Sequence, residues 1–224
     1  FHIINIVALI IEETLKDWDI QINYGIKTGF NEAFIITGEK RKELIEQDHK
    51  SAEIIRPILR GRDIKRYGYE FADLYLISTF PSLKIDIENY PAVKKHLLSF
   101  GMKRLEQTGN EYYVDGETVK ARKKTCNKWF ETQDSISYWD DFSKHKITYI
   151  EIMTDNPEDG YDFPCFSFDT ENCVALNTAY IMTGNVEEIK HILGILNSKL
   201  GRLLVKNYVV QLQQRQFRML NQYV

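Results

Sequence analysis

Two short segments hold the residues whose types and spacing are best suited to chemistry. The first is a loop between two apolar stretches, and its notable residues are Gly25, Lys27, Thr28, Gly29 and Asn31. Glycines at such positions let backbone amides come close to a partner. We therefore expect Lys27, Thr28 and Asn31 to project toward a phosphate or a base edge. The alternative is a tight turn whose residues satisfy only one another.

The second segment, residues 56–66, is strongly basic and turns at Gly61. It contains five Lys or Arg residues and a single acid, Asp63. Its candidates for phosphate contacts are Arg60, Arg62, Lys65 and Arg66. Each phosphate that such a residue neutralises adds roughly 0.9 to the slope of log affinity against log salt concentration. The alternative is that Arg62 and Asp63 form a local ion pair that holds the turn.

Charge is segregated along the chain. The net charge of −3 and the pI near 6.0 argue against an indiscriminate polyanion binder. Residues 119–128 nevertheless carry five basic residues and no acid, whereas residues 134–171 carry ten carboxylates and two lysines. The candidates in the basic run are Lys120, Arg122, Lys123 and Lys124. They follow an expected hairpin, so they either enter a major groove or form a surface loop.

A polar cluster near the C-terminus has side chains suited to reading adenine and guanine. It consists of Gln211, Gln213, Gln214, Arg215 and Gln216. It is equally compatible with a solvated helix or strand edge. Trp129 is more typical of a core position than of a stacking platform.

Other chemistries fit poorly. A group of acids and lysines superficially resembles a nuclease site, but its spacing is wrong and Pro91 interrupts the strand such a site needs; its members are Asp86, Glu88, Lys94 and Lys95. An acidic loop lacks the spacing of a calcium loop; its members are Asp155, Glu158, Asp159 and Asp162. The five histidines are scattered, and the three cysteines are too far apart for a metal site, which indicates reduced thiols in a cytoplasmic protein. We expect no metal and no cofactor in this chain.

The pattern of apolar and turn residues predicts an α+β fold: a mixed, largely antiparallel sheet of short strands flanked by helices. Strands are expected at 18–23, 32–36, 74–78, 147–153 and 178–182, with a hairpin at Asp115-Gly116. Helices are expected at 2–16, 39–47, 51–55 and 90–106, and from Asn185 through Leu203. Residues 1–224 form one domain, or two lobes at 1–110 and 111–224. No apolar run reaches the roughly 20 residues that span a membrane.

Several segments, in this order and spacing, resemble the TaqI-like C-terminal specificity domain. This domain occurs in type IIG restriction-modification enzymes and in related adenine-N6 DNA methyltransferases, including those of BREX-type phage defence. The matching segments are Gly25–Phe34, Pro57–Tyr67, Tyr75–Ile77, Tyr90–Leu97, Lys128–Glu131, Lys146–Tyr149 and Leu193–Leu200.

The resemblance implies a domain that recognises a sequence in double-stranded DNA for a methyltransferase domain N-terminal to it. S-adenosylmethionine would bind in that upstream domain, and a nuclease would lie further upstream in a type IIG enzyme. The chain begins at Phe1 and has no Asn-Pro-Pro-aromatic motif, since Asn156-Pro157-Glu158 lacks the second proline and the aromatic residue. We therefore expect a non-catalytic fragment of a longer chain. The alternative is a module that docks onto another subunit of a defence system, for which the acidic residues 134–171 would be suited.

Overall fold

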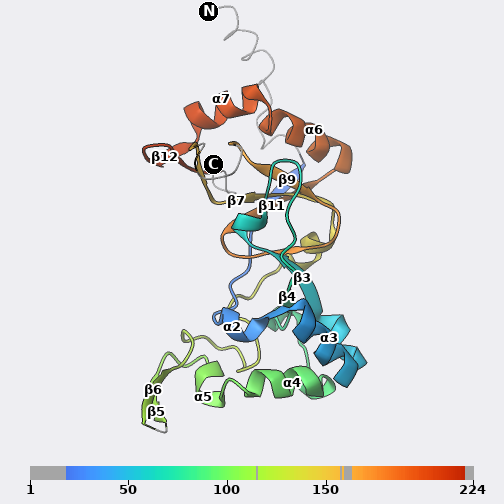
Figure 1. The fold of residues 1–224 in the computed structure, drawn as a ribbon, viewed down its shortest axis with the longest axis vertical. Coiled ribbons are helices and arrows are strands. Elements are labelled where there is room, and N and C mark those ends of the chain that lie inside the picture. Colours follow the sequence, from blue (N-terminus) through green and yellow to red (C-terminus); the bar gives the residue numbers. More distant parts are fainter. Residues whose placement is uncertain (1–18, 115, 157, 159–162, 220–224) are drawn as a thin grey trace, which may run out of the picture.

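The computed structural model describes residues 19–114, 116–156, 158 and 163–219. The helix expected at 2–16 lies outside these residues. Figure 1 shows an elongated molecule with two lobes that meet at a narrower waist.

The first lobe is built on a four-stranded antiparallel sheet that follows the order β1-β11-β7-β9. Its strands are β1 (Ile20–Tyr24), β11 (Ala179–Gly184), β7 (Lys146–Ile150) and β9 (Phe166–Asp169). Helix α6 (Val186–Leu196) packs on β7, β9 and β11 and continues into α7 (Lys199–Tyr208). A smaller antiparallel sheet completes this lobe with β12 (Val210–Gln213), β13 (Gln216–Arg218) and β8 (Ile152–Thr154).

The second lobe is built on a sheet of order β10-β3-β4-β2, in which only the β10–β3 pair is parallel. Its strands are β2 (Ile35–Thr37), β3 (Ile55–Leu59), β4 (Leu74–Ile77) and β10 (Val174–Ala175). Around it lie α2 (Asn31–Phe34), α3 (Gly38–Gln47), α4 (Pro91–Leu98) and α5 (Met102–Leu105). The hairpin of β5 (Glu111–Val114) and β6 (Glu117–Lys120) projects from the end of this lobe (Figure 1).

Short 3-10 helices connect these elements. They are η1 (His49–Ile54), η2 (Gly61–Asp63), η3 (Pro81–Leu83), η4 (Ile87–Asn89) and η5 (Trp139–Ser143).

The α+β class is confirmed, and the short strands of the described residues are distributed over four sheets. The lobes, however, are not the segments 1–110 and 111–224. Strand β1 comes from the N-terminal part but pairs with β11, and β10 comes from the C-terminal part but pairs with β3. Each lobe therefore needs chain from both sides of residue 110.

Most expected elements are present, and their ends differ for local reasons. The strand expected at 32–36 is wrong in its first half, because the Phe30 carbonyl accepts the amides of Ala33 and Phe34 and closes the helical turn α2. The helix expected at 90–106 is broken at Gly101, which has φ +86°, a region that favours glycine. The strand expected at 147–153 divides at Glu151 between two sheets.

The last helix also divides in two. Asn197 ends α6, and the Ser198 hydroxyl accepts the Gly201 amide at 3.1 Å and begins α7. A β-carbon at Gly201 would lie 2.2 Å from the Leu196 carbonyl oxygen, so only glycine fits this tight junction. Each helix has buried residues on its own account, Ile189, Ile192, Leu193 and Leu196 in α6 and Val205 in α7, so the apolar pattern continues across the junction.

Within the described residues an apolar core runs through both lobes, and a fully buried ion pair lies inside it. Lys146 and Asp169 are each fully buried, with Nζ 2.5 Å from Oδ2. Lys146 also donates to the Phe142 carbonyl at 2.7 Å, and Asp169 accepts the backbone amide of Cys173 at 3.0 Å. Burial lowers the pKa of Lys146 below its ordinary value, and the Asp169 carboxylate opposes that shift. The pair joins β7 to β9 at the edge of the sheet.

Replacing Lys146 with methionine should destabilise the fold strongly, because Asp169 would be left buried without its counter-charge. Breaking a buried pair from one side costs about 3–5 kcal/mol. Urea unfolding followed by circular dichroism should show this as a lower midpoint. Lys190→Met is the control, since Lys190 and its partner Glu187 are both exposed, so its change should stay below about 1 kcal/mol. Equal midpoints for the two variants would contradict the role of the buried pair.

Candidate nucleic-acid interface

The turn between β10 and β11, Leu176–Thr178, positions the glycine loop of the N-terminal region. The Gly25 amide donates to the Ala179 carbonyl at 2.7 Å, and the Ile26 amide donates to the Ala175 carbonyl at 2.9 Å. A β-carbon at Gly25 would lie 2.1 Å from the Leu176 carbonyl oxygen. Glycine is therefore required at position 25, and the loop that follows it is held against this turn.

The same turn holds the basic segment on its other flank. The Leu176 amide donates to the Leu59 carbonyl at 2.9 Å, and the Gly61 amide donates to the Thr178 hydroxyl at 3.1 Å. The structure thus brings the glycine loop and the basic turn to opposite flanks of one short segment. Neither spacing nor residue type revealed this contact in the sequence.

A polar hollow of about 370 Å³ lies beside the glycine loop. It is lined by residues 27–32 together with Arg104, Gln133 and Asn177. Lys27 and Asn31 are exposed there, and the Lys27 ammonium makes no ion pair or hydrogen bond with any described residue. Arg104 lies over the Phe30 ring at 4.6 Å.

Arg104, Gln133 and Asn177 were missed by sequence reasoning. Arg104 belongs to the last turn of an expected helix, and the two amides are single polar residues in connecting segments. No motif marks any of them. Contacts to the glycine loop bring them together: Asn177 lies in the turn that holds the loop, the Gln133 amide donates to the Thr28 carbonyl at 3.1 Å, and Arg104 lies over the Phe30 ring.

A second hollow, of about 450 Å³, lies on the other flank of the turn. Arg60 and Arg62 line it together with Glu151, Ile150 and Ile152 among others. The two arginines have different roles, because Arg60 holds Asp63 through both carboxylate oxygens, with its Nη2 2.7 Å from Oδ1. This hydrogen bonding raises the pKa of Arg60.

The local ion pair expected for this turn therefore exists, but it joins Arg60, and not Arg62, to Asp63. Arg62 is exposed, and its guanidinium makes neither an ion pair nor a hydrogen bond with the residues that the structure describes. Of the two arginines, Arg62 is the one available to a ligand.

The next two basic residues have different partners. Lys65 lies 3.6 Å from the carboxylate of Glu70, an exposed ion pair that a ligand could displace. Arg66 donates from Nη2 to the Asn197 carbonyl at the end of α6. Arg66 is thus engaged in joining the basic segment to the α6–α7 junction.

Two of the residues expected to contact DNA, Thr28 and Arg122, have buried side chains in this structure. The Thr28 hydroxyl donates to Asn31 Oδ1 at 2.6 Å and accepts the Phe30 amide at 3.1 Å, so it stabilises the loop from inside. Arg122 is 3 % exposed and donates to four backbone carbonyls, which belong to Thr28, Leu105, Trp129 and Glu131. Burial lowers the pKa of Arg122 to about 10, which leaves it charged at neutral pH.

The other three basic residues of this run are exposed. Lys120 ends strand β6 and lies 3.9 Å from Glu111 across the hairpin. Lys123 and Lys124 follow in a connecting segment at the surface. Of the four basic residues expected here, three are accessible, and they lie in the second lobe near the hairpin.

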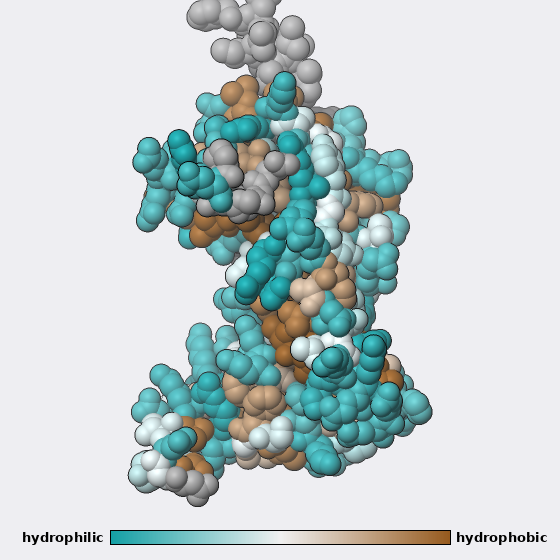
Figure 2. Space-filling model, viewed as in Figure 1, coloured by the Kyte–Doolittle hydropathy of each residue, from teal (hydrophilic) through white to brown (hydrophobic). Residues whose placement is uncertain are grey.

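The glycine loop leads into α2, which lies on one side of the waist, and β12 and the β5–β6 hairpin project on this same side (Figure 1). The space-filling view in Figure 2 shows the surface hollowed between the two projections. We call this the hollow side. It is the concave surface along which an elongated ligand would contact both lobes.

Other candidate features have structural roles. Trp129 packs against the core beside Phe130, with ring centroids 5.5 Å apart. Asp155 pairs with Arg202 and Lys206, and Asp159 and Asp162 lie outside the described residues. In the described part of the chain, no group of His, Cys, Asp and Glu is arranged to hold a metal ion. No described helix combines the length and the apolar character needed to cross a bilayer.

A family model for the TaqI-like C-terminal specificity domain matches residues 56–224. The chain belongs to this family. The specificity domain also resembles a solved structure, the type IIL restriction-modification enzyme MmeI in complex with DNA, with a TM-score of 0.52 and 16% identity. The match covers 89% of this chain and 23% of the MmeI chain, so the specificity domain spans about a quarter of that enzyme's length. A comparison with curated proteins gave no match.

Replacing Arg122 with alanine should destabilise the specificity domain, because several buried carbonyls would lose their donor. Each unsatisfied buried group costs about 1–3 kcal/mol, so the total loss should be about 3 kcal/mol or more. Thermal unfolding of Arg122→Ala and Lys124→Ala gives the comparison. Lys124 is exposed, and its removal should change stability by less than about 0.5 kcal/mol. A normal melting temperature for Arg122→Ala would show that this side chain is free to serve a ligand.

Proposed function

We propose that this chain is the DNA target-recognition domain of a restriction-modification enzyme and that duplex DNA lies along its hollow side. The observation that carries the proposal is the meeting of the glycine loop and the basic turn on the two flanks of Leu176–Thr178. These two segments present Lys27 and Arg62, the exposed cations of the waist that form no ion pair within the described chain. Membership of the TaqI-like specificity family supports the same conclusion.

The contacts would divide into two kinds. Lys27, Arg62 and Lys65 would neutralise phosphates and set the register of the domain on the duplex. Lys120, Lys123 and Lys124 would extend these contacts toward the hairpin. The amides of Asn31, Gln133 and Asn177, which line one hollow, have the donors and acceptors that read base edges.

Catalysis would belong to another part of the enzyme. We propose a methyltransferase domain in the same polypeptide that binds S-adenosylmethionine, extrudes the target adenine and methylates its N6 atom. The enzyme would act in the cytoplasm. The sequence resemblance to adenine-N6 methyltransferase specificity domains supports this assignment. The chain itself would position the site and carry no catalytic residue.

A second candidate function is docking to another protein subunit, and the β5–β6 hairpin favours it. The side chain of Tyr113 is 79% exposed at the end of this hairpin, beside the carboxylates of Glu111 and Glu117. Carboxylates repel a phosphate backbone, so this tip is better suited to a protein than to DNA. Docking and recognition are compatible if they use different ends of the lobe.

Exchanging this domain between two full-length enzymes with different sites tests the proposal. Methylated sites in host DNA would be mapped by sequencing, and complex assembly by size-exclusion chromatography. A recipient that acquires the donor's motif supports recognition. An unchanged motif with impaired assembly would overturn it in favour of docking.

Substituting the free cations should weaken DNA binding on every sequence. Lys27→Ala and Arg62→Ala in the full-length protein should each reduce the magnitude of the salt slope by about 0.9, because each removes one phosphate contact. Fluorescence anisotropy with a labelled duplex at several salt concentrations measures this slope. Lys42→Ala is the charge-matched control, since Lys42 is exposed on α3, away from the hollow side in Figure 1. Identical salt slopes for all three variants would show that DNA does not contact Lys27 or Arg62.

A further inference from the structure

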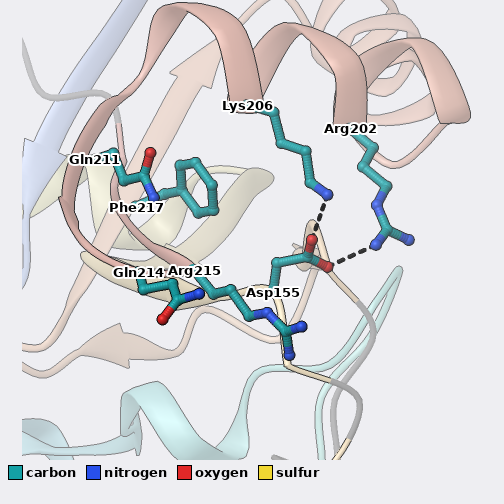
Figure 3. Close-up of a pocket in the computed structure, with 7 residues that line it drawn as sticks. All are labelled: Asp155, Arg202, Lys206, Gln211, Gln214, Arg215 and Phe217. Carbon is teal, nitrogen blue, oxygen red and sulfur yellow. Dashed lines mark hydrogen bonds and ion pairs between the residues drawn. The ribbon is translucent and has the colours of Figure 1, made fainter.

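The hairpin of β12 and β13 is a separate polar feature at one end of the hollow side. All four residues of β12 are exposed, and β12 is the edge strand of its sheet. Gln214 and Arg215 form the turn between the strands. Figure 3 shows both side chains lining an open hollow of about 500 Å³.

The backbone of this turn is firmly anchored. Arg215 has φ +67°, and its carbonyl accepts the Asp155 amide at 2.8 Å. Strand β13 pairs with β8, and Phe217 is buried with its ring 5.2 Å from that of Phe163. The turn therefore presents its side chains from a rigid base, as a reader of base sequence must.

The polar groups of the hollow fall into a paired set and a free set. Asp155 holds Arg202 at 2.6 Å and also pairs with Lys206 (Figure 3). Burial alone would raise the pKa of Asp155, but the hydrogen bonds from Lys206 and Arg202 keep it below its ordinary value. The side chains of Gln214 and Arg215, in contrast, are exposed and form no hydrogen bond or ion pair with other described residues.

The charge balance favours a polyanion. The residues that line the hollow include three cations and a single carboxylate. Asp155 fixes the positions of Arg202 and Lys206 without neutralising both of them. An arginine and a glutamine at the tip of a two-stranded ribbon, with two fixed cations behind it, match the geometry of a ribbon in a major groove about 12 Å wide.

We propose that the β12–β13 hairpin enters the major groove and that Arg215 and Gln214 read bases there. This inference rests on the proposed function and extends it to the residues that set specificity. Arg215 would donate both arms of its guanidinium to O6 and N7 of a guanine, and Gln214 would pair with N6 and N7 of an adenine. Arg202 and Lys206 would contact the flanking phosphates.

Selection of bound sequences from a randomised duplex library, with the full-length protein, tests this assignment. Arg215→Lys keeps the charge but removes the two-armed donor. It should reduce the preference at one G·C position by about 5- to 150-fold, which corresponds to the 1–3 kcal/mol of a bidentate base contact. Gln214→Ala should relax one A·T position. Arg202→Ala should weaken binding on all sequences and leave the motif intact.

The outcomes separate this inference from the proposed function. If the unchanged protein enriches a motif and neither Arg215→Lys nor Gln214→Ala alters any position, the hairpin does not read bases, while recognition by the domain stands. If Arg215→Ala weakens all sequences equally and Arg215→Lys binds as the unchanged protein does, Arg215 contacts only phosphate and the inference is overturned. If the unchanged protein enriches no motif, both proposals fail. Melting temperatures of each variant exclude a general loss of folding.

Discussion

Backbone from three parts of the chain meets at the turn Leu176–Thr178. The glycine loop bonds to the residues that flank this turn, β3 bonds to Leu176, and the basic turn bonds to Thr178 through the Gly61 amide. The Thr178 carbonyl also accepts the Glu151 amide, at the point where β7 gives way to β8. Because backbone hydrogen bonds fix distance and direction together, this turn sets the relative positions of the segments that line the waist. Each lobe contains strands from both halves of the chain, so the segments that cross the waist are needed to build both lobes.

Basic residues in this chain divide into those that hold the fold and those left for a ligand. Arg60, Arg122 and Lys146 are each bonded to carboxylates or carbonyls of the chain itself. Arg62 lies two positions after Arg60, and Lys123 directly follows Arg122, but both are exposed. A buried charge must be paired, since its desolvation cost is large. Some basic residues of the runs at 56–66 and 119–128 are therefore bonded within the chain, and the exposed ones are available to contact phosphate.

The overall charge suits this division. A net charge of −3 limits attraction to DNA of arbitrary sequence. Binding would then depend on a few positioned cations and on contacts to base edges, as expected for a domain that sets specificity. The carboxylates at the end of the β5–β6 hairpin mark a limit to the surface that DNA could occupy.

The sequence by itself determined the fold class, most of the elements and the family, because these depend on local patterns. Alternation in β1, the amphipathic faces of the last two helices and the turn at Asp115-Gly116 are all short-range signals. It also singled out the two segments that meet at the waist. Only the tertiary structure decided which of their residues are accessible. In the sequence, Thr28 and Arg122 could not be distinguished from the exposed polar residues near them. Arg122 binds the Thr28 carbonyl, which lies 94 residues away, and polarity alone does not reveal such a distant partner. Burial and pairing depend on contacts between distant segments, and these exist only once the chain has folded.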